Sequence, residues 1–232
     1  LHLSPSETVK LDVFLRFLER CSQKGSHLFI LGDLFDYWVG DDDIENPLHQ
    51  HVLPALHELT YKGATLSMMR GNRDFLISKK LSDLTNACIL PDPYVIDLHG
   101  QRTLLSHGDQ WCTDDEEYQA IRSVVRTDKW ARDFLTLPIP ERHDRAKSYR
   151  QKSDASKKNK GLEIMDVSVK TVESAFKTYN CQRIIHGHTH RHAHHEHLID
   201  AQIRERFVLS DWNEEGQALT FTEAGYSDQF FT

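Results

Sequence analysis

The sequence predicts an α/β fold built on a parallel sheet. Helix-like and strand-like segments alternate through the first third of the 232 residues, which favours βαβ units. A glycine and a polar residue follow several of the strand-like runs, at the position where α/β sheets bind their ligands. The composition, 39% hydrophobic and 27% charged, is ordinary for a globular protein. The sequence has no internal repeat and no flexible linker, and we predict one domain over residues 1–232.

Four elements are expected before residue 70. Residues 6–23 carry apolar side chains at helical spacing, with Ser6 as a candidate N-cap. Residues 28–31 form a short apolar run that is typical of a buried strand, although such a run alone does not exclude a helix. A second helix is expected over 47–61, where a proline opens the segment and a glycine follows it, and a second strand over 65–69.

The rest of the chain is expected to add a hairpin, further strands and a long helical part. Residues 113–179 are mostly polar and helical in pattern, and we place a helical insertion at about 116–162 within them. The turn at His99-Gly100 is hairpin-like. The remaining predicted elements are a short helix at 75–84, strands at 95–98 and 102–106, a helix at 166–179, and strands at 183–185, 203–209 and 218–222.

The charge is distributed unevenly. The net charge of -7 argues against a general nucleic-acid-binding protein, which would be basic. Residues 122–160, however, hold 12 Lys or Arg against 5 Asp or Glu, a local balance of +7. Such a run is either a solvated helical face or a basic patch that faces an anionic substrate or an anionic membrane surface.

Cysteine usage and hydropathy indicate a cytosolic protein. The four cysteines are far apart and form no CxxC pair, so we expect reduced thiols and no disulfide framework. No apolar run approaches the length of about 18 residues that a membrane-spanning helix needs. The chain starts at Leu1 and is expected to be trimmed, which leaves open whether a signal peptide precedes it.

Polar groups of one chemical kind follow four of the predicted strands. They are carboxylate, amide and imidazole groups close to a glycine, namely Asp33, Asn72, His107, and His188 with His190. Oxygen and imidazole ligands suit Mn, Fe or Zn. A carboxylate can bridge two cations, and two cations roughly 3.5–4 Å apart can hold a water molecule in line with a phosphorus atom. Each signal alone is ordinary turn chemistry, but their shared position after strands predicts a metal site.

These motifs resemble those of the calcineurin-like metallophosphoesterase superfamily, in which GD, GNRD, HGD and HGHTH occur in this order. The match is closer to the branch that hydrolyses UDP-2,3-diacylglucosamine in the lipid A synthesis of Gram-negative bacteria. The residues that carry it are GDLFDYWVGDDD (32–43), GNRDFL (71–76), HGDQWCTDDEEYQ (107–119), IMDV (164–167) and HGHTHR (186–191). The resemblance implies a four-layer αββα sandwich whose helical insertion forms a lid over the active site. Leu1-His2-Leu3 resembles the end of the superfamily's first motif, Asp-x-His, so we expect the first strand to be truncated in this chain.

The resemblance also implies two Mn²⁺ ions per chain. One would be bound by His2, Asp33 and His190, together with the carboxylate that the first motif lacks here. The other would be bound by Asp33, Asn72, His107 and His188, with Asp33 as the bridge. His186 does not fall on a ligand position, and Asp41-Asp42-Asp43 is expected to be a solvated or supporting loop and not a ligand set.

By the same resemblance, Asn72, Arg73 and His107 would be catalytic. Arg73 stands where many members have a histidine that protonates the leaving group, and arginine cannot do so because its pKa stays above about 12. A phosphate monoester leaves without a proton, so the arginine suits pyrophosphate cleavage, where it would clamp phosphate oxygens; the alternative is a surface arginine paired with Asp74. The substrate contacts implied are Asn72, Arg73, Asp115, Ser153, Lys157, Lys160 and His188. An asparagine is usual where Lys157 stands, so the register of 153–160 stays open.

The implied reaction is hydrolysis of the pyrophosphate bond of UDP-2,3-diacylglucosamine. Water held by the metals would attack the α-phosphorus and release UMP and 2,3-diacylglucosamine 1-phosphate. The enzyme would be cytoplasmic and peripheral on the cytoplasmic face of the inner membrane, where the basic residues of the insertion face anionic lipid, with neither a nucleic acid nor an obligate protein as partner. The apolar residues of the insertion would either line a groove for acyl chains or pack in the core of the helices themselves; they are Ile121, Val124, Val125, Trp130, Phe134, Leu135 and Leu137.

Two other functions are compatible with the sequence. One is a dinuclear phosphoesterase of the same superfamily that acts on soluble nucleotides or phosphomonoesters. The other is a metal-poor scaffold that binds partners and catalyses nothing, which the incomplete first motif would allow for the chain in this form.

Overall fold

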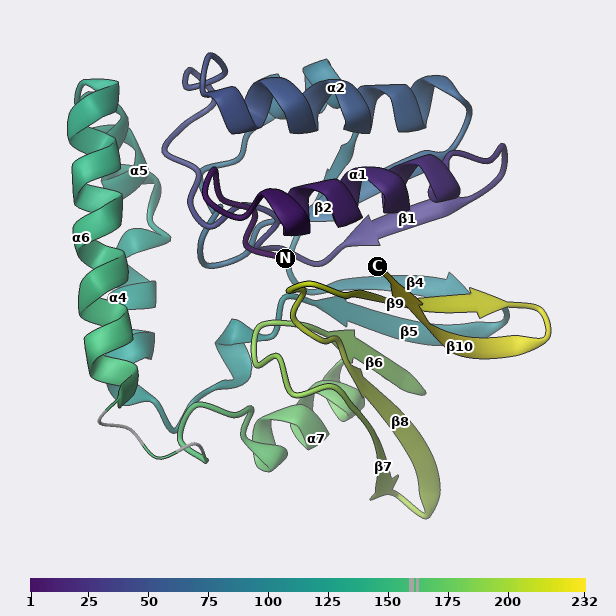
Figure 1. Cartoon of the computed structure of the whole chain (residues 1–232). Coiled ribbons are helices and arrows are strands. Elements are labelled where there is room, and N and C mark those ends of the chain that lie inside the picture. The colour runs from purple at the N-terminus through teal and green to yellow at the C-terminus, as the bar shows by residue number, and fades with distance from the viewer. Residues whose placement is uncertain (159–160, 162) are drawn as a thin grey trace.

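The computed structural model describes residues 1–158, 161 and 163–232, with the backbone alone at 154, 157 and 158. Within these residues the strands form two sheets and a separate hairpin (Figure 1). The first sheet is parallel, in the order β1-β2-β3. Its strands are β1 (His27–Ile30), β2 (Thr65–Met69) and β3 (Cys88–Leu90).

The second sheet has the order β4-β5-β6-β8-β7. Its inner strands β5, β6 and β8 are parallel to one another, and the outer strands β4 and β7 pair antiparallel to their neighbours. The strands are β4 (Tyr94–Leu98), β5 (Gln101–Ser106), β6 (Arg183–His186), β7 (Ala193–Ile199) and β8 (Gln202–Val208), and the hairpin is β9 (Gly216–Thr222) with β10 (Gly225–Phe231).

The two sheets face each other between layers of helices. Successive residues of a strand point to opposite faces, and neighbouring residues here belong to different apolar clusters. In β2, Met68 packs under the helices of the first sheet, whereas Met69 points between the sheets. In β6, Ile185 also points between the sheets, and Ile184 packs against the helix on the far side. These helices are α1 (Thr8–Cys21), α2 (Pro47–Tyr61) and α3 (Lys79–Thr85) beside the first sheet and α7 (Val169–Thr178) beside the second (Figure 1).

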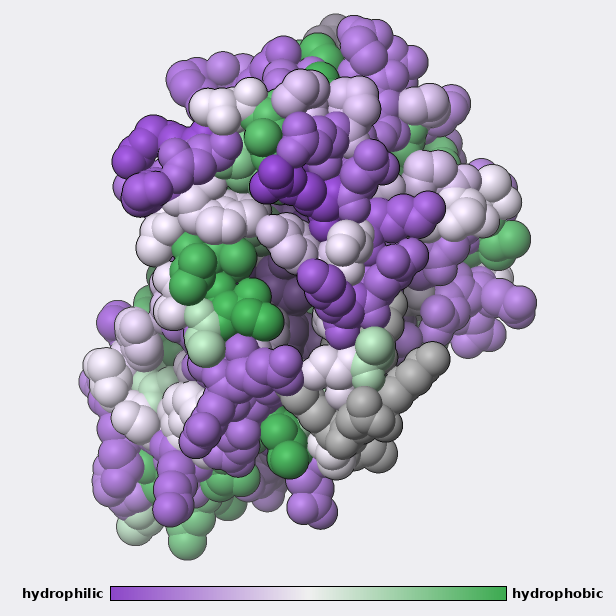
Figure 2. All heavy atoms as spheres, turned by 90° about the vertical axis from the view of Figure 1, so that its left-hand side faces the viewer, coloured by the Kyte–Doolittle hydropathy of each residue, from purple (hydrophilic) through white to green (hydrophobic). Residues whose placement is uncertain are grey.

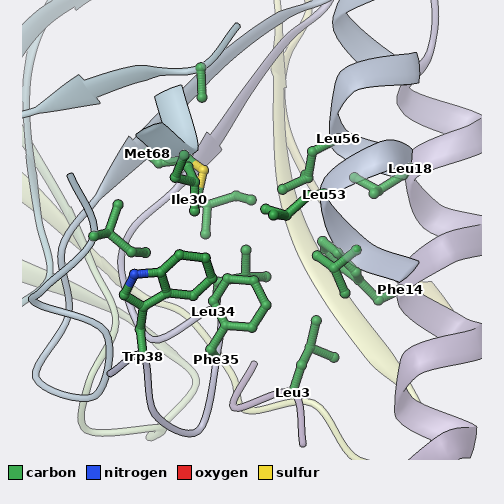
Figure 3. Packing of buried hydrophobic residues seen from close by; sticks show 14 of the residues in the cluster. Leu3, Phe14, Leu18, Ile30, Leu34, Phe35, Trp38, Leu53, Leu56 and Met68 are labelled. Atoms are coloured by element: carbon green, nitrogen blue, oxygen red, sulfur yellow. The ribbon is translucent and has the colours of Figure 1, made fainter. Parts of the chain in front are cut away.

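The predicted four-layer αββα sandwich is therefore confirmed. Its outer cluster packs side chains of α1 and α2, including Phe14 and Leu56, against the first sheet (Figure 3). The same cluster contains Leu3 and Phe35, whose segments form a short parallel bridge. The bridge and the cluster thus hold the segment just before Phe35, which includes Asp33, at the carboxyl end of β1.

Most predicted elements occur where the sequence placed them, and α2 and β2 have the predicted bounds. The predicted helix at 75–84 is wrong at its start, since α3 begins at Lys79. Asp41 explains this start, because its carboxylate accepts hydrogen bonds from the backbone N–H groups of Ser78, Lys80 and Leu81. A residue from a distant loop thus caps the helix, which no local pattern could indicate.

Three strands were not predicted. β3 has only three residues, which is too short for a periodic signal. β7 is the histidine-rich segment AHHEHLI, which lacks an alternation of apolar and polar residues. β10 is GYSDQFF, whose first residues are polar or exposed. These strands form because a neighbouring strand offers hydrogen-bonding partners, and that information is not local.

The predicted insertion is helical in the structure. It consists of α4 (Glu116–Val125), α5 (Asp128–Leu135) and α6 (Ile139–Lys158), which stand beside the sandwich (Figure 1). α6 is attached through Arg142, which is 2% exposed and donates to the Val39 carbonyl at 2.7 Å and to Asp42 Oδ1 at 2.8 Å. The next residue of the loop, Asp43, pairs with His143 of α6 at 2.9 Å. Asp41 thus caps α3, and Asp42 and Asp43 attach α6 to the sandwich.

The role of Asp41 can be tested by Asp41→Ala. We expect the free energy of unfolding to fall by about 1–2 kcal/mol, the usual value of a helix cap, because the first turn of α3 loses its acceptor. Denaturant unfolding would measure the change. Asp83→Ala in the same helix is the control: Asp83 only pairs with Lys79 on the surface, and we expect a loss of at most about 0.5 kcal/mol. Equal losses in the two variants would contradict the capping role.

Candidate metal centre

The carboxyl ends of four strands bring the predicted ligands together. Asp33 follows β1, Asn72 follows β2, His107 follows β5 and His188 follows β6. One ligand atom from each of Asp33, His107 and His188 lies within 4.8 Å of the other two. Asn72 Oδ1 lies 2.8 Å from His188 Nδ1 and 3.1 Å from His107 Nε2. The four residues predicted for one metal position therefore form one cluster.

The other predicted position is built beside it. His2 Nε2 lies 3.1 Å from His190 Nε2 and 3.6 Å from Asp33 Oδ2. Asp33 Oδ2 is also 3.6 Å from His107 Nε2. One carboxylate oxygen is thus near imidazole nitrogens of both clusters, as a bridging ligand must be. The structure brings together all six predicted ligand residues.

The donor atoms fit a cation. His107 Nδ1 lies 2.8 Å from the Leu31 carbonyl, which only accepts, so Nδ1 carries a proton and donates it. A neutral His107 then has only a lone pair at Nε2, and this lone pair faces the oxygens of Asn72 and Asp33. The backbone N–H of Asn72 lies 3.4 Å from the same nitrogen and donates to it. The carboxylate, the amide oxygen and the imidazole nitrogen that converge here are the ligand types that a divalent cation takes in proteins.

The pKa shifts of Asp33 and His107 also indicate a cluster that favours positive charge. Burial raises the pKa of Asp33, but the imidazoles of His107, His2 and His188 outweigh burial and leave the pKa below its ordinary value. Burial lowers the pKa of His107, but Asp33 and Asp109 outweigh it and leave the pKa raised. The negative charge that favours a proton on His107 also attracts a cation.

The ligand residues have an unusual backbone. His2, Asp33, His188 and His190 all have positive φ, between 54° and 66°. Residues other than glycine are uncommon in this left-handed region. Such residues cluster at functional sites, where the surrounding structure holds them in place.

A buried carboxylate holds the two ligand loops together. Asp74 is fully buried and accepts hydrogen bonds from the backbone N–H groups of Asp33, Leu34 and Gly71, at 3.1, 2.8 and 2.8 Å. Burial, with the charge of Asp33 added, raises the pKa of Asp74 to about 6. The loops also touch directly, since a Cβ atom on Gly71 would lie 2.1 Å from Asp33 Oδ1. Asp74 is a structural residue of the site, and the motif GNRD did not reveal this.

Arg73 is not paired with its neighbour. Among the described residues no ion pair joins the Arg73 guanidinium to Asp74, and the surface-pair alternative is therefore wrong. The backbone N–H of Arg73 donates to Asp33 Oδ1 at 2.8 Å. The Arg73 backbone thus lies against the Asp33 carboxylate, and the residue is half-buried.

His186 lies outside the ligand cluster, as predicted. Its Nδ1 donates to the Gly187 carbonyl at 3.0 Å, and its Nε2 lies 3.1 Å from Arg206 Nη1, which donates to it. Burial, with the charge of Arg206 added, lowers the pKa of His186 to about 3. The ring is neutral and both of its nitrogens are used within the sheet.

Two residues beside the cluster were not predicted. The ring of Tyr118 packs on His188 with the ring centroids 5.6 Å apart. Its hydroxyl donates to Asp109, which is fully buried and also pairs with Arg122 of α4 and with Arg126, the residue that follows α4. The only sequence signal was their place in HGDQWCTDDEEYQ, which does not distinguish contact residues from neighbours.

The remaining predicted substrate contacts belong to the helical insertion and not to the strand ends. The Asp115 carboxylate caps α4 by accepting from the Tyr118 N–H at 3.0 Å. Ser153 lies in α6 and is half-buried. Lys157 belongs to α6, but its side chain is outside the described residues, and Lys160 lies outside them entirely.

Four arginines of the basic run pair with carboxylates of the sandwich. Arg122 and Arg126 pair with Asp109. Arg142 pairs with Asp42, and Arg150 lies 3.3 Å from Asp36. Asp36 in turn lies 3.8 Å from His2 Nδ1, so α6 reaches the residues behind the metal cluster. The sequence alternatives for this run, a solvated face or an anion-binding patch, omitted this structural role.

The face formed by α4, α5 and α6 is hollowed. Figure 2 shows a hollow with hydrophobic side chains gathered along one side of it. In α4 and α5 the exposed apolar residues are Ile121, Val124 and Leu135, at 56%, 57% and 41% exposure. Phe134, in contrast, is buried, and Trp130 packs with it in the main core. The predicted apolar stripe therefore divides into a packed part and an exposed part. Among the described residues, every helix is too short or too polar to span a bilayer.

The fold and the ligand cluster agree with the comparisons to known proteins. A family described as "Calcineurin-like phosphoesterase" matches residues 1–192, and the chain belongs to this family. Membership implies a divalent metal site. Within the family the chain is similar over nearly its whole length to proteins named UDP-2,3-diacylglucosamine hydrolase. That of Aromatoleum aromaticum is 42% identical over 97% of this chain and 91% of the relative. Those of Aeromonas salmonicida and Salmonella typhi are 41% and 42% identical, over 94% and 96% of this chain and 86% and 92% of the relatives.

The close contact of the ligand loops can be tested by Gly71→Ala. Because the new Cβ would meet the Asp33 carboxylate at 2.1 Å, we expect metal affinity to fall by about tenfold or more, or folding to fail. Titration of the metal-free protein with Mn²⁺ would measure the first outcome and circular dichroism the second. Gly161→Ala is the control, since nothing lies within 4 Å of its Cβ and its φ is not positive. Unchanged metal affinity in Gly71→Ala would contradict the contact.

Proposed function

We propose that the chain hydrolyses the pyrophosphate bond of UDP-2,3-diacylglucosamine to UMP and 2,3-diacylglucosamine 1-phosphate in lipid A biosynthesis. The observation that carries the proposal is the assembly of all six predicted ligand residues in one cluster, in a chain that matches hydrolases of this name over nearly its whole length. The similarity to hydrolases favours an enzyme over the metal-poor scaffold.

We propose that the cluster holds two divalent cations and that both are Mn²⁺. They would be held by His2, Asp33 and His190 and by Asp33, Asn72, His107 and His188. Bound there, they supply a Lewis acid for the phosphate oxygens and a water molecule of lowered pKa.

The residues of the chain supply the rest. Asp33 stays ionised between the imidazoles, because its pKa is lowered. The Arg73 guanidinium presents a planar fork of N–H donors that matches phosphate oxygens and stays charged at every working pH. It neutralises charge as the bond to the leaving phosphate breaks, and no proton needs to be delivered to that group. The reaction therefore fits an anhydride better than an alkyl phosphate ester.

The lipid part of the substrate would lie at the helical side of the site. We propose that α4, α5 and α6 form the lid, with the acyl chains at their exposed apolar residues and with Asp115, Ser153, Lys157 and Lys160 near the sugar and phosphates. A substrate with acyl chains resides in a membrane. We therefore propose that the protein works at the cytoplasmic face of the inner membrane, attached peripherally.

Substrate choice tests the proposal. With Mn²⁺, we expect turnover of UDP-2,3-diacylglucosamine to exceed that of a bis-nucleotide or of p-nitrophenyl phosphate, because only the first has acyl chains for the hollow. Mass spectrometry should detect UMP and the lipid 1-phosphate. Chelation with EDTA should abolish turnover, and two Mn²⁺ per chain should restore it. Faster cleavage of the soluble substrates would favour the alternative phosphoesterase.

Arg73→Ala tests the role of the guanidinium. We expect kcat to fall by about 10²–10³-fold, as for the loss of other groups that stabilise transition-state charge. Arg73→Lys should recover only part of it, since lysine lacks the fork of donors. The control is Arg16→Ala on the exposed side of α1, which should leave kcat unchanged. An active Arg73→Ala enzyme would exclude the role.

A further inference from the structure

We infer that Asp109 is a positioning residue that fastens α4 to the loop carrying His107, and thereby fixes the helical side of the substrate site. The inference rests on the proposed function for its kinetic consequence, but the attachment itself is a property of the fold.

The attachment consists of one buried carboxylate and three donors. Asp109 Oδ2 accepts from Tyr118 Oη at 2.8 Å, from Arg122 Nε at 2.8 Å and from Arg126 Nη2 at 3.2 Å. The donors are four residues apart, so Tyr118 and Arg122 lie on one face of α4 and Arg126 continues that face at the helix C-cap. Asp109 itself is fully buried, two residues after His107.

The backbone of the same loop adds further contacts. Gln119 Nε2 donates to the carbonyls of Asp109 and Cys112, at 2.8 and 3.1 Å. The loop turns back at this point in a short 3-10 helix, Asp109–Trp111. The contacts to this loop therefore run along α4 from Tyr118 to its C-cap, Arg126.

The helix is also tied to the second ligand loop. The Arg126 guanidinium lies over the ring of Phe75, 5.3 Å from its centroid. Phe75 follows Arg73-Asp74 and packs against Trp130 of α5, with centroids 5.6 Å apart. Arg126 thus bridges the loop after β5 and the loop after β2, both of which carry proposed metal ligands.

This arrangement determines where the outer face of α4 points. Tyr118, Arg122 and Arg126 occupy the inner face, and Ile121 and Val124 are exposed on another. Tyr118 also packs on His188. A rotation or shift of α4 would move the apolar residues relative to the metal cluster, whose own ligands are held by Leu31 and Asn72. Loss of Asp109 should therefore affect a lipid substrate much more than a small one.

The test combines two observables in the full-length protein with Mn²⁺. Hydrogen exchange of the amides of 118–126 reports the attachment of α4 without reference to activity. KM and kcat are measured for UDP-2,3-diacylglucosamine and, in parallel, for bis(p-nitrophenyl) phosphate, which needs only the metal cluster and Arg73. The variants are Asp109→Asn and Arg122→Met, with Arg122→Lys as the conservative rescue and Ser123→Ala, an exposed residue of α4, as the control.

For Asp109→Asn and Arg122→Met we expect exchange at least about tenfold faster and KM for the lipid substrate raised by about tenfold or more, with kcat/KM for the small substrate within about threefold of the parent protein. Arg122→Lys should recover part of both effects, and Ser123→Ala should show neither. If Asp109→Asn does not fold, Arg122→Met still decides.

Two results would overturn the inference: unchanged exchange in α4, or a parallel loss for both substrates, which is the pattern of general damage to the metal centre. If the parent protein does not turn over the lipid substrate at all, the proposed function fails, and the exchange data still decide whether Asp109 fastens α4.

Discussion

The site depends on the close approach of two loops, one after β1 and one after β2. The approach is possible because Gly71 has no side chain where the Asp33 carboxylate lies, and it is maintained by the buried carboxylate of Asp74, which binds backbone N–H groups of both loops. A buried carboxylate is costly unless several donors satisfy it, and here the donors come from the segments that must meet. The same contact holds Asp33 close to His107 after β5 and His188 after β6. The candidate ligand cluster therefore depends on it.

Much of this arrangement follows from simple rules of sequence. The alternation of helices and strands predicted the parallel sheet, and the rule that ligands gather at the carboxyl ends of strands predicted the cluster of Asp33, Asn72, His107 and His188. The start of α3, the strands β3, β7 and β10, and the role of Asp109 were not predicted. Each of these depends on a partner far away in the chain, such as Asp41 for α3, and a periodic pattern reports only on neighbours.

The local charge balance likewise does not reveal which distant residues the basic side chains bind. A surplus of basic residues in 122–160 is compatible with a solvated face, an anionic ligand or an acidic membrane. In the structure Arg122, Arg126 and Arg142 bind carboxylates and a carbonyl of the sandwich, so part of the surplus serves to attach the helices. Local net charge therefore overstates the positive field that an external partner would meet, because each internal pair removes one positive charge from it.

The ligand residues and the residues that stabilise the fold are largely separate. Left-handed backbone costs about 1–2 kcal/mol for each residue with a Cβ, and His2, Asp33, His188 and His190 all have it. None of these residues belongs to the three apolar clusters of the described residues. Those clusters lie on both faces of each sheet and supply the stability that keeps the strained residues in place. The side chains of the candidate ligands are consequently held in position by the surrounding structure.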